Sequence, residues 1–237
     1  MSTSFRFKQF TIHQDRCAMK VGTDGVLLGS WVPVSEEVDT ILDIGAGTGV
    51  IALMMAQRSN AEVIDAIEIE SSAYEQAVEN FEASDWGDRL FCYHASFQEF
   101  FQEIEETYDL LISNPPFFKE NYKTQDVDRD MARFEDALPF EHLFIGVSRL
   151  LSENGKFALI IPFKEENTVV DIGKSVGLFP QKITRVKGTP TSKIKRSMLL
   201  FGFNNVSCEP DELIIEHDRH QYTDSYIDLT KAFYLNM

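Results

Sequence analysis

A glycine-rich turn, Asp43-Ile44-Gly45-Ala46-Gly47-Thr48-Gly49, stands between a short apolar run and a helical segment. The apolar run, residues 40–44, has the length and composition of a buried strand, and residues 50–57 have the pattern of a helix. Glycine adopts backbone conformations that are closed to other residues and lets the backbone approach a ligand closely. A strand, a glycine turn and a helix in this order predict an α/β fold with a ligand at the turn.

Strand and helix patterns alternate along the chain from residue 40 onward. We expect strands at 40–44, 62–68, 90–93, 108–113, 156–161, 181–186 and 196–203, with an edge strand at 212–215. We expect helices at 50–57, 71–82, 97–105, 140–151, 164–176 and 225–234. This alternation predicts a doubly wound, mostly parallel sheet covered on both faces, and the two late strands without a helix between them predict one antiparallel member.

The length of 237 residues fits one compact domain. We expect residues 1–39 to form a short N-terminal addition and residues 40–237 to form the cofactor-binding and catalytic core. Ligands of such sheets bind beyond the carboxyl ends of the strands. The informative residues should therefore follow the strands directly.

The glycine spacing bears on the class of ligand. Nicotinamide-binding folds carry G-x-G-x-x-G, whereas the spacing here is G-x-G-x-G and position 50 is Val. The loop together with Asp43 resembles that of S-adenosylmethionine binders, whose cationic sulfonium benefits from a nearby carboxylate. Glu68 ends the second strand, where its two oxygens can accept hydrogen bonds from both ribose hydroxyls. The cofactor residues predicted here are Asp43, Gly45, Ala46, Gly47, Gly49 and Glu68.

Ser96 and Phe97 follow the third strand. The methyltransferase pattern usually has an Asp at this place that binds the adenine amino group of the cofactor. A serine hydroxyl can still accept one hydrogen bond, and a phenylalanine ring can stack on adenine. We expect both residues at the cofactor, with the adenine contact altered.

The tetrapeptide Asn114-Pro115-Pro116-Phe117 ends the fourth strand. Two prolines lock φ and push each preceding residue into an extended conformation, so the turn is stiff. The Asn114 side-chain oxygen and the Pro115 carbonyl can hold the two hydrogens of an –NH2 group. Phe117 offers a face for stacking the target ring. These four residues are the predicted catalytic set, and Asn114 also lies beside the cofactor methyl.

This tetrapeptide is specific for the methylation of amino groups. An exocyclic amine is a poor nucleophile because its lone pair is delocalised into the ring. Holding both hydrogens aims the lone pair at the methyl group, so the transfer needs positioning more than a strong base. Adenine N6, cytosine N4, guanine N2 and a glutamine side-chain amide all remain open as acceptors.

Charge is unevenly distributed along the chain. The formal net charge of −16 taken alone argues against nucleic acid. Residues 1–23 nevertheless carry four basic residues and one acid, and residues 181–200 carry six basic residues and no acid. A protein that is acidic overall can still bind a phosphate backbone through two basic segments. The RNA-binding residues predicted from the second segment are Arg185, Lys187, Lys193, Lys195 and Arg196.

The remaining composition excludes several other classes. The three cysteines, Cys17, Cys92 and Cys208, are far apart and form no CxxC pair, so neither a zinc site nor a disulfide framework is indicated. The histidines are isolated or lie in a polar loop, and the chemistry needs no metal. Since no apolar run approaches membrane-spanning length and residues 1–10 have no apolar signal core, we expect a cytoplasmic protein.

Several stretches resemble one family, the bacterial tRNA(Val) adenine-37 N6-methyltransferases. The stretches that carry this resemblance are 7–10, 15–25, 43–49, 113–117 and 222–235. The resemblance implies a seven-stranded methyltransferase sheet, S-adenosyl-L-methionine as cofactor and the anticodon stem-loop of a tRNA as partner. It also implies that Lys20, Thr23 and Asp24 lie near the methionine end of the cofactor. An N-cap followed by a turn is an equally sufficient explanation of 23–25. The last residue of the tetrapeptide is often Tyr in this family, and Phe117 keeps the ring without the hydroxyl.

Two rival functions fit part of the sequence. A protein-glutamine methyltransferase acting on release factors shares the Asn-Pro-Pro turn but would not need the basic segment at 181–200. A non-catalytic cofactor-binding module would not need an intact tetrapeptide. The residues themselves indicate an amino-group acceptor, and the tRNA species comes from the resemblance alone.

Overall fold

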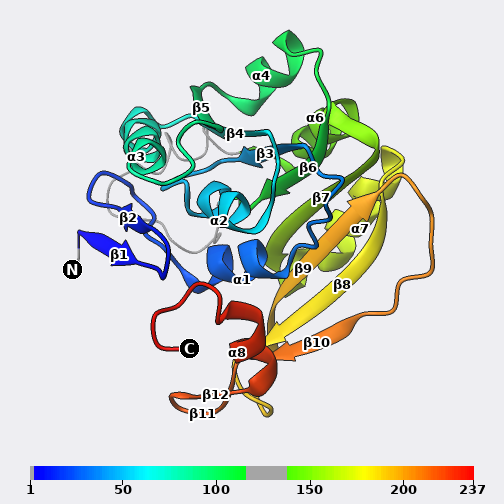
Figure 1. Cartoon of the computed structure of the whole chain (residues 1–237). Helices are drawn as coiled ribbons and strands as arrows, with labels where there is room; N and C mark the ends of the chain where they lie inside the picture. Colours follow the sequence, from blue (N-terminus) through cyan, green and yellow to red (C-terminus); the bar gives the residue numbers. More distant parts are fainter. Residues whose placement is uncertain (1–2, 116–137) are drawn as a thin grey trace, which may run out of the picture.

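The computed structural model describes residues 3–115 and 138–237. Eight strands form the central sheet in the order β10-β8-β9-β7-β6-β3-β4-β5 (Figure 1). Among the described residues, β9 is the only strand of this sheet that runs antiparallel to its neighbours, β7 and β8. The predicted mostly parallel sheet with one antiparallel strand is confirmed. The count of seven strands was one too low, because the edge strand expected near 212–215 adds an eighth, β10, to the sheet.

The strands and helices follow the predicted alternation. The strands of the sheet are β3 (Thr40–Ile44), β4 (Val63–Glu68), β5 (Leu90–His94), β6 (Tyr108–Ser113), β7 (Leu151–Pro162), β8 (Phe179–Lys187), β9 (Ile194–Gly202) and β10 (Asp211–Ile214). The helices are α1 (Thr23–Trp31), α2 (Val50–Arg58), α3 (Ser71–Glu82), α4 (Phe97–Glu103), α6 (Phe140–Leu150), α7 (Glu166–Ser175) and α8 (Asp224–Thr230), with a 3-10 turn η1 (Phe163–Glu165) before α7. Two short hairpins, β1 (Ser4–Arg6) with β2 (Thr11–His13) and β11 (Glu216–Asp218) with β12 (Gln221–Tyr222), complete the fold.

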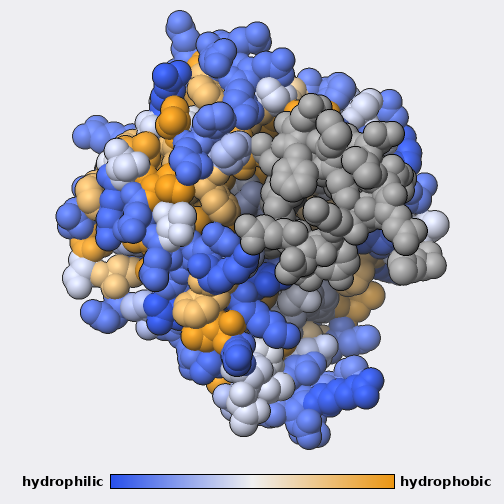
Figure 2. Space-filling model, turned by 180° about the vertical axis from the view of Figure 1, so that it is seen from behind, coloured by the Kyte–Doolittle hydropathy of each residue, from blue (hydrophilic) through white to orange (hydrophobic). Residues whose placement is uncertain are grey.

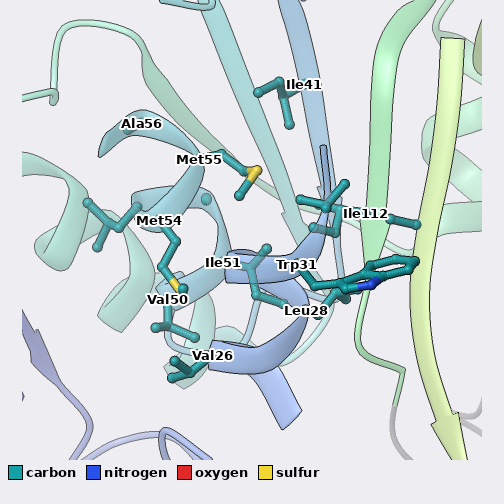
Figure 3. Close-up of a cluster of buried hydrophobic side chains, with 14 of the residues drawn as sticks. Val26, Leu28, Trp31, Ile41, Val50, Ile51, Met54, Met55, Ala56 and Ile112 are labelled. Carbon is teal, nitrogen blue, oxygen red and sulfur yellow. The ribbon is translucent and has the colours of Figure 1, made fainter. Parts of the chain in front are cut away.

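Helices cover both faces of the sheet, and each face has its own apolar cluster. Side chains from α1, α2, α3 and α8 pack on one face, and side chains from α4, α6 and α7 pack on the other. Figure 3 shows the first cluster, in which Leu28 and Trp31 of α1 and Ile51 and Met55 of α2 gather with Ile112 of β6. The central strands are buried on both faces, which is why their sequences are apolar runs without alternation.

Helix α1 was not expected from the sequence. Its nine residues include seven buried ones, from Gly25 to Trp31, so it lacks the polar face that gives a surface helix its period. The expected N-cap at residues 23–25 was wrong, because Gly22 caps the helix and Thr23 and Asp24 are its first residues. The N-cap of α3 is Glu70, whose carboxylate accepts from the N–H groups of Ser72 and Ala73.

The two ends of the chain meet on the α1 side of the sheet (Figure 1). The backbone N–H of Lys8 donates to the oxygen of Phe233 at 2.9 Å, and the Lys8 ammonium donates to the oxygen of Met237 at 2.9 Å. Phe7 and Phe233 are both buried, and their rings meet edge to face. The hairpin β1–β2 and the segment after α8 are therefore packed together and against the core.

Hydrophilic residues cover most of the described surface in Figure 2, and hydrophobic residues form small separate groups there. Within residues 3–115 and 138–237, no helix combines the length and the apolar character that crossing a membrane requires.

Candidate active site

The glycine turn and the start of the tetrapeptide lie next to each other because β3 and β6 are parallel neighbours. Ile44 pairs with Ser113, and the Ser113 hydroxyl donates to the Ile44 carbonyl at 2.8 Å. Gly45 and Asn114 directly follow these two paired residues. Parallel strands end at the same edge of a sheet, so both motifs reach the edge where such folds bind ligands.

A cavity of about 350 Å³ opens at this edge. Its walls come from three segments: residues 19–25 before and within α1, the glycine turn with the start of α2, and the end of β6. Eight of the predicted site residues line it, namely Lys20, Thr23, Asp24, Gly45, Ala46, Gly47, Asn114 and Pro115. The cavity therefore unites the predicted cofactor loop and the predicted catalytic turn.

The glycine turn presents its backbone to this cavity. Gly45 and Gly47 have φ values of 76° and 56°, and a Cβ built on either residue would meet no atom within 4 Å. Gly49 also has a positive φ, but a Cβ there would stand 2.4 Å from the Phe81 ring. The first two glycines leave room for a ligand, whereas the third lets α2 begin close to α3.

Two buried acids, Asp43 and Glu68, accept hydrogen bonds from backbone N–H groups in and next to the glycine turn. Glu68 at the end of β4 is 8 % exposed, and its carboxylate accepts from the N–H of Gly47 at 2.8 Å and of Glu70 at 2.9 Å. Asp43 is fully buried and accepts from the N–H of Ala52 at 3.1 Å, while its other oxygen has no hydrogen-bond partner among the described atoms. Burial raises the pKa of Asp43 to about 7, and the nearby charge of Glu68 acts in the same direction. Neither carboxylate lines the cavity itself.

The predicted catalytic turn is described as far as Pro115. Asn114 is half-buried, and a Cβ on Gly25 would stand 3.9 Å from its side-chain nitrogen. Gly25 therefore lets the first turn of α1 approach Asn114. Pro116 and Phe117, which complete the predicted catalytic set, lie outside the described residues.

Asp24 and Arg196, predicted to contact different ligands, form an ion pair. The Arg196 Nε donates to the Asp24 carboxylate at 2.7 Å, and both side chains are about one-third exposed. This contact ties the start of β9 to the rim of the cavity. Lys20 and Thr23 are exposed on the same rim.

Ser96 and Phe97 are occupied at the start of α4. The Ser96 hydroxyl accepts from the Glu99 N–H at 3.2 Å and the Ser96 N–H donates to the Glu99 carboxylate at 3.1 Å, which makes a capping box. The hydroxyl also donates to this carboxylate at 2.7 Å. Phe97 is buried against α6, where a Cβ on Gly146 would stand 2.4 Å from its ring. These contacts account for both residues as parts of the fold, and a role at the cofactor stays a prediction for them.

The five predicted RNA-binding cations differ in their contacts. Arg185 Nη2 donates to the buried Glu166 at 2.7 Å, and Lys187 pairs with Glu212 at 2.6 Å. Together with the Arg196 pair, these contacts occupy three of the five. Lys193 and Lys195 are exposed at the β8–β9 turn, on the same edge of the sheet as the cavity.

A group of buried amides, which no sequence pattern indicated, holds the N-terminal segment in place. Asn80 of α3 accepts from the His13 N–H and donates to the carbonyl oxygens of His13 and Thr48, all within 2.9 Å. Gln76 accepts from the Arg16 N–H, and Gln14 accepts from the Val21 N–H. Residues 13–21 are thereby fixed beside the glycine turn. These amides differ from others in the sequence only in being buried, which the structure shows.

Comparison with known proteins shows the family to which the chain belongs. Residues 19–161 match the methyltransferase small domain family. A tRNA1(Val) (adenine(37)-N6)-methyltransferase of Flavobacterium johnsoniae is 64 % identical over 98 % of this chain and 100 % of its own length. Proteins of the same name from Christiangramia forsetii and Bacteroides fragilis are 62 % and 46 % identical, each covering 98 % of both chains.

Solved structures support the fold at low sequence identity. A predicted O-methyltransferase from Agrobacterium tumefaciens matches with a TM-score of 0.68 at 20 % identity, over 89 % of this chain and 96 % of its own. TYW2 of P. horikoshii in complex with MeSAdo matches with a TM-score of 0.58 at 13 % identity, over 85 % of this chain and 71 % of its own. The resemblance found in the sequence is confirmed. The chain belongs to the same family as the tRNA1(Val) (adenine(37)-N6)-methyltransferases and carries the methyltransferase small domain.

Proposed function

We propose that the protein transfers a methyl group from S-adenosyl-L-methionine to the N6 amine of adenine 37 in the anticodon loop of tRNA1(Val). The names of relatives that are up to 64 % identical over their whole length support this substrate. The observation that carries the proposal within the structure is the shared cavity, in which Asn114 and Pro115 face the glycine turn. A cytoplasmic location, where tRNA is modified, is part of the same proposal.

The residues around the cavity fit the cofactor. Gly45 and Gly47 leave open space over their backbone, and the paired carboxylate oxygens of Glu68 lie directly behind Gly47. The unpartnered oxygen of Asp43 leaves a buried acceptor close to the same turn. When bound, the cofactor supplies an electrophilic methyl group on a positively charged sulfur. We assign its methionine end to Lys20, Thr23 and Asp24 and its ribose to Glu68, with Ala46 and Gly49 shaping the turn between them.

Asn114 and Pro115 would orient the acceptor. The side-chain oxygen of Asn114 and the carbonyl of Pro115 each accept one hydrogen of the adenine amine, which points the nitrogen lone pair toward the methyl group. With the amine held in this way, the nitrogen would be in line to accept the methyl group that the bound cofactor supplies, and the surplus proton would leave the nitrogen for water. Holding the amine in this orientation supplies most of the rate. Phe117, after Pro116, is assigned the stacking face for the target base.

The carboxyl edge of the sheet also carries the cations assigned to RNA. Lys193 and Lys195 are exposed there and would contact phosphates. Arg185, Lys187 and Arg196 have acidic partners, so their contribution to RNA binding is expected to be smaller. An anticodon loop suits this arrangement, since an unpaired adenine leaves its stack at a lower cost than a paired one.

Nucleoside analysis tests the proposal directly. The purified protein is incubated with S-adenosyl-L-methionine and tRNA1(Val) lacking the modification. Mass spectrometry of the digested nucleosides identifies the methylated base, and mass spectrometry of ribonuclease fragments locates it in the tRNA. N6-methyladenosine at position 37 of tRNA1(Val) is the expected product. Radiolabel appearing in release-factor protein instead of tRNA would favour the protein-glutamine methyltransferase, and cofactor binding without turnover on either substrate would favour a non-catalytic module.

A further inference from the structure

A second cavity, of about 480 Å³, adjoins the active-site cavity. The two share one wall, formed by Val21, Gly22 and Thr23 at the start of α1. Gln14 fixes this wall by accepting from the Val21 N–H at 2.9 Å. The opposite walls come from the hairpin β1–β2 and from the chain around and after α8, which flank α1 in Figure 1. We call this second cavity the tyrosine pocket.

Aromatic rings from distant parts of the chain line the tyrosine pocket. Tyr222 and Tyr226 lie with ring centroids 5.2 Å apart, and Tyr234 contacts Phe5 at 6.2 Å. Tyr226 is 3 % exposed and shares a side-chain hydrogen bond with Tyr234, whereas Tyr222 is 38 % exposed. The buried Tyr226 and the half-buried Tyr234 thus form a fixed base, and Tyr222 presents a ring that a ligand can reach.

One cationic side chain borders the tyrosine pocket and can pair with an anionic group. Among the described residues that line it, Arg6 is the only one with a charged side chain. Arg6 is exposed at the end of β1, while the body of the protein is strongly acidic. A cation beside open aromatic rings fits a nucleotide, because the rings stack on the base and the guanidinium pairs with the phosphate.

We propose that the tyrosine pocket holds the base of an unpaired nucleotide next to the target adenine, with its phosphate on Arg6. The inference rests on the proposed function, since it extends the same RNA strand from one cavity into the next. A target adenine that enters the first cavity leaves its neighbours without a stacking partner. A strand that crosses the wall at Val21–Thr23 brings the adjacent base to the tyrosines, which replace that partner.

Paired changes in protein and RNA test the contact. The RNA is an anticodon stem-loop with the target adenine, made in versions with an abasic residue at each neighbouring loop position. Affinity is measured by fluorescence anisotropy for the parent and for Tyr222→Ala. Removing one stacking ring should weaken binding of the intact loop about five- to tenfold. The abasic change at the recognised position should weaken the parent similarly but leave Tyr222→Ala unchanged, because the two changes remove the same contact.

Two control variants separate stacking from structure. Tyr222→Phe keeps the ring and should bind the intact loop like the parent. Phe203→Ala removes a ring of similar exposure, 36 %, just after β9 at the opposite edge of the sheet, and should also bind like the parent. Arg6→Gln should lower the dependence of affinity on salt by about one phosphate contact.

The outcomes distinguish this inference from the proposed function. If the parent methylates the intact stem-loop but Tyr222→Ala weakens every abasic version by the same factor, the tyrosine pocket holds no base and the inference fails alone. If the parent methylates no RNA, the proposed function fails first. Coupling confined to one abasic position establishes both the pocket and the direction of the strand.

Discussion

Two regions at the carboxyl edge of the sheet are built in opposite ways. The glycine turn presents backbone to the cavity and is held from behind by buried groups such as Glu68 and Asn80. The β8–β9 turn, which does not line the cavity, carries long charged side chains. Three of its cations pair with acids, and Lys193 and Lys195 extend into solvent.

This difference separates positioning from attraction. Buried hydrogen bonds and positive φ values fix atoms to within a fraction of an ångström, which methyl transfer requires. Exposed lysines hold no fixed position, but they attract phosphates over about a Debye length. Substitutions behind the glycine turn should therefore change stability or catalysis, and substitutions at the tip of the β8–β9 turn should change RNA affinity.

The largest effect is expected from the buried charge beneath the glycine turn. The pKa of Asp43 is raised to about 7, so the folded protein keeps this proton between pH 4 and 7 whereas the unfolded chain loses it. The folded state then binds more protons, and stability falls as pH rises through this window. Asp43→Asn removes the effect, so its stability relative to the parent should rise by about 3 kcal/mol from pH 4 to pH 7. Urea unfolding at both pH values measures this difference, and a constant difference would contradict the raised pKa.

The predicted catalytic turn beside the glycine turn is tested at Asn114. Asn114→Ala should lower kcat by about 10²–10³-fold, the range seen when one positioned hydrogen-bonding group is removed from a reacting centre. Cofactor affinity should stay near that of the parent, because Asn114 orients the acceptor. Turnover and calorimetry on one preparation provide both values. Retained turnover would remove Asn114 from its assigned role.

Arg185 on β8 tests whether a cation that pairs with a buried acid contributes to stability rather than to RNA binding. Arg185→Ala leaves Glu166, which is 4 % exposed, without its cation. We expect a decrease of about 3 kcal/mol in the free energy of unfolding, the lower end for a buried pair because Arg185 is one-third exposed. Lys187→Ala is the matched control, since its partner Glu212 is exposed and such pairs contribute about 0–1 kcal/mol. Unchanged stability with a large decrease in tRNA affinity would restore Arg185 as an RNA contact.

Glu68 tests whether the buried acid also meets the cofactor. Glu68→Ala should weaken cofactor binding by roughly 1.5–3 kcal/mol, the value of hydrogen bonds to a charged acceptor. The variant also frees the Gly47 N–H, so Glu68→Gln, which keeps one oxygen acceptor, should weaken binding less. Calorimetry gives both affinities. Equal affinities for the parent and Glu68→Ala would exclude this carboxylate from the cofactor site.

The sequence predicted those features that depend on residues close together in the chain. Gly45, Gly47 and Asn114 come directly after apolar strands. Because these strands are parallel neighbours, the three residues lie close together at the carboxyl edge of the sheet. Helix α1 escaped prediction because it is buried on almost every side and shows no polar period. The β1–β2 hairpin escaped because its strands have only three residues each.

Partners of charged and polar side chains could not be predicted, because they come from distant segments. Asp24 and Arg196 are 172 positions apart and were assigned to different ligands, yet they bind each other. Arg185 and Glu166 belong to different elements whose contact depends on the packing of α7 on β8. A basic stretch of sequence therefore locates an attractive surface, but only the fold tells which of its cations remain available.

The smallest effect is expected at the exposed β8–β9 turn. The double change Lys193→Ala and Lys195→Ala should weaken tRNA binding without changing stability or cofactor affinity. Removing one lysine–phosphate interaction lowers the slope of log affinity against log salt by about 0.7–0.9, so removing both should flatten it by about 1.4–1.8. Arg196 is left in place, because its partner Asp24 lines the cavity at the glycine turn. Anisotropy titrations over a range of salt concentrations measure the slope.

A matched double variant removes the same charge from the far edge of the sheet. Lys156 lies beside Gly202 at the end of β9, and Lys174 lies in the last turn of α7, so both are remote from the cavity. Lys156→Ala with Lys174→Ala should keep the parent's salt slope. If the two double variants behave alike, Lys193 and Lys195 add only net charge. The cations that hold tRNA must then be sought in the N-terminal window from Arg6 to Lys20, where Arg6 borders the tyrosine pocket.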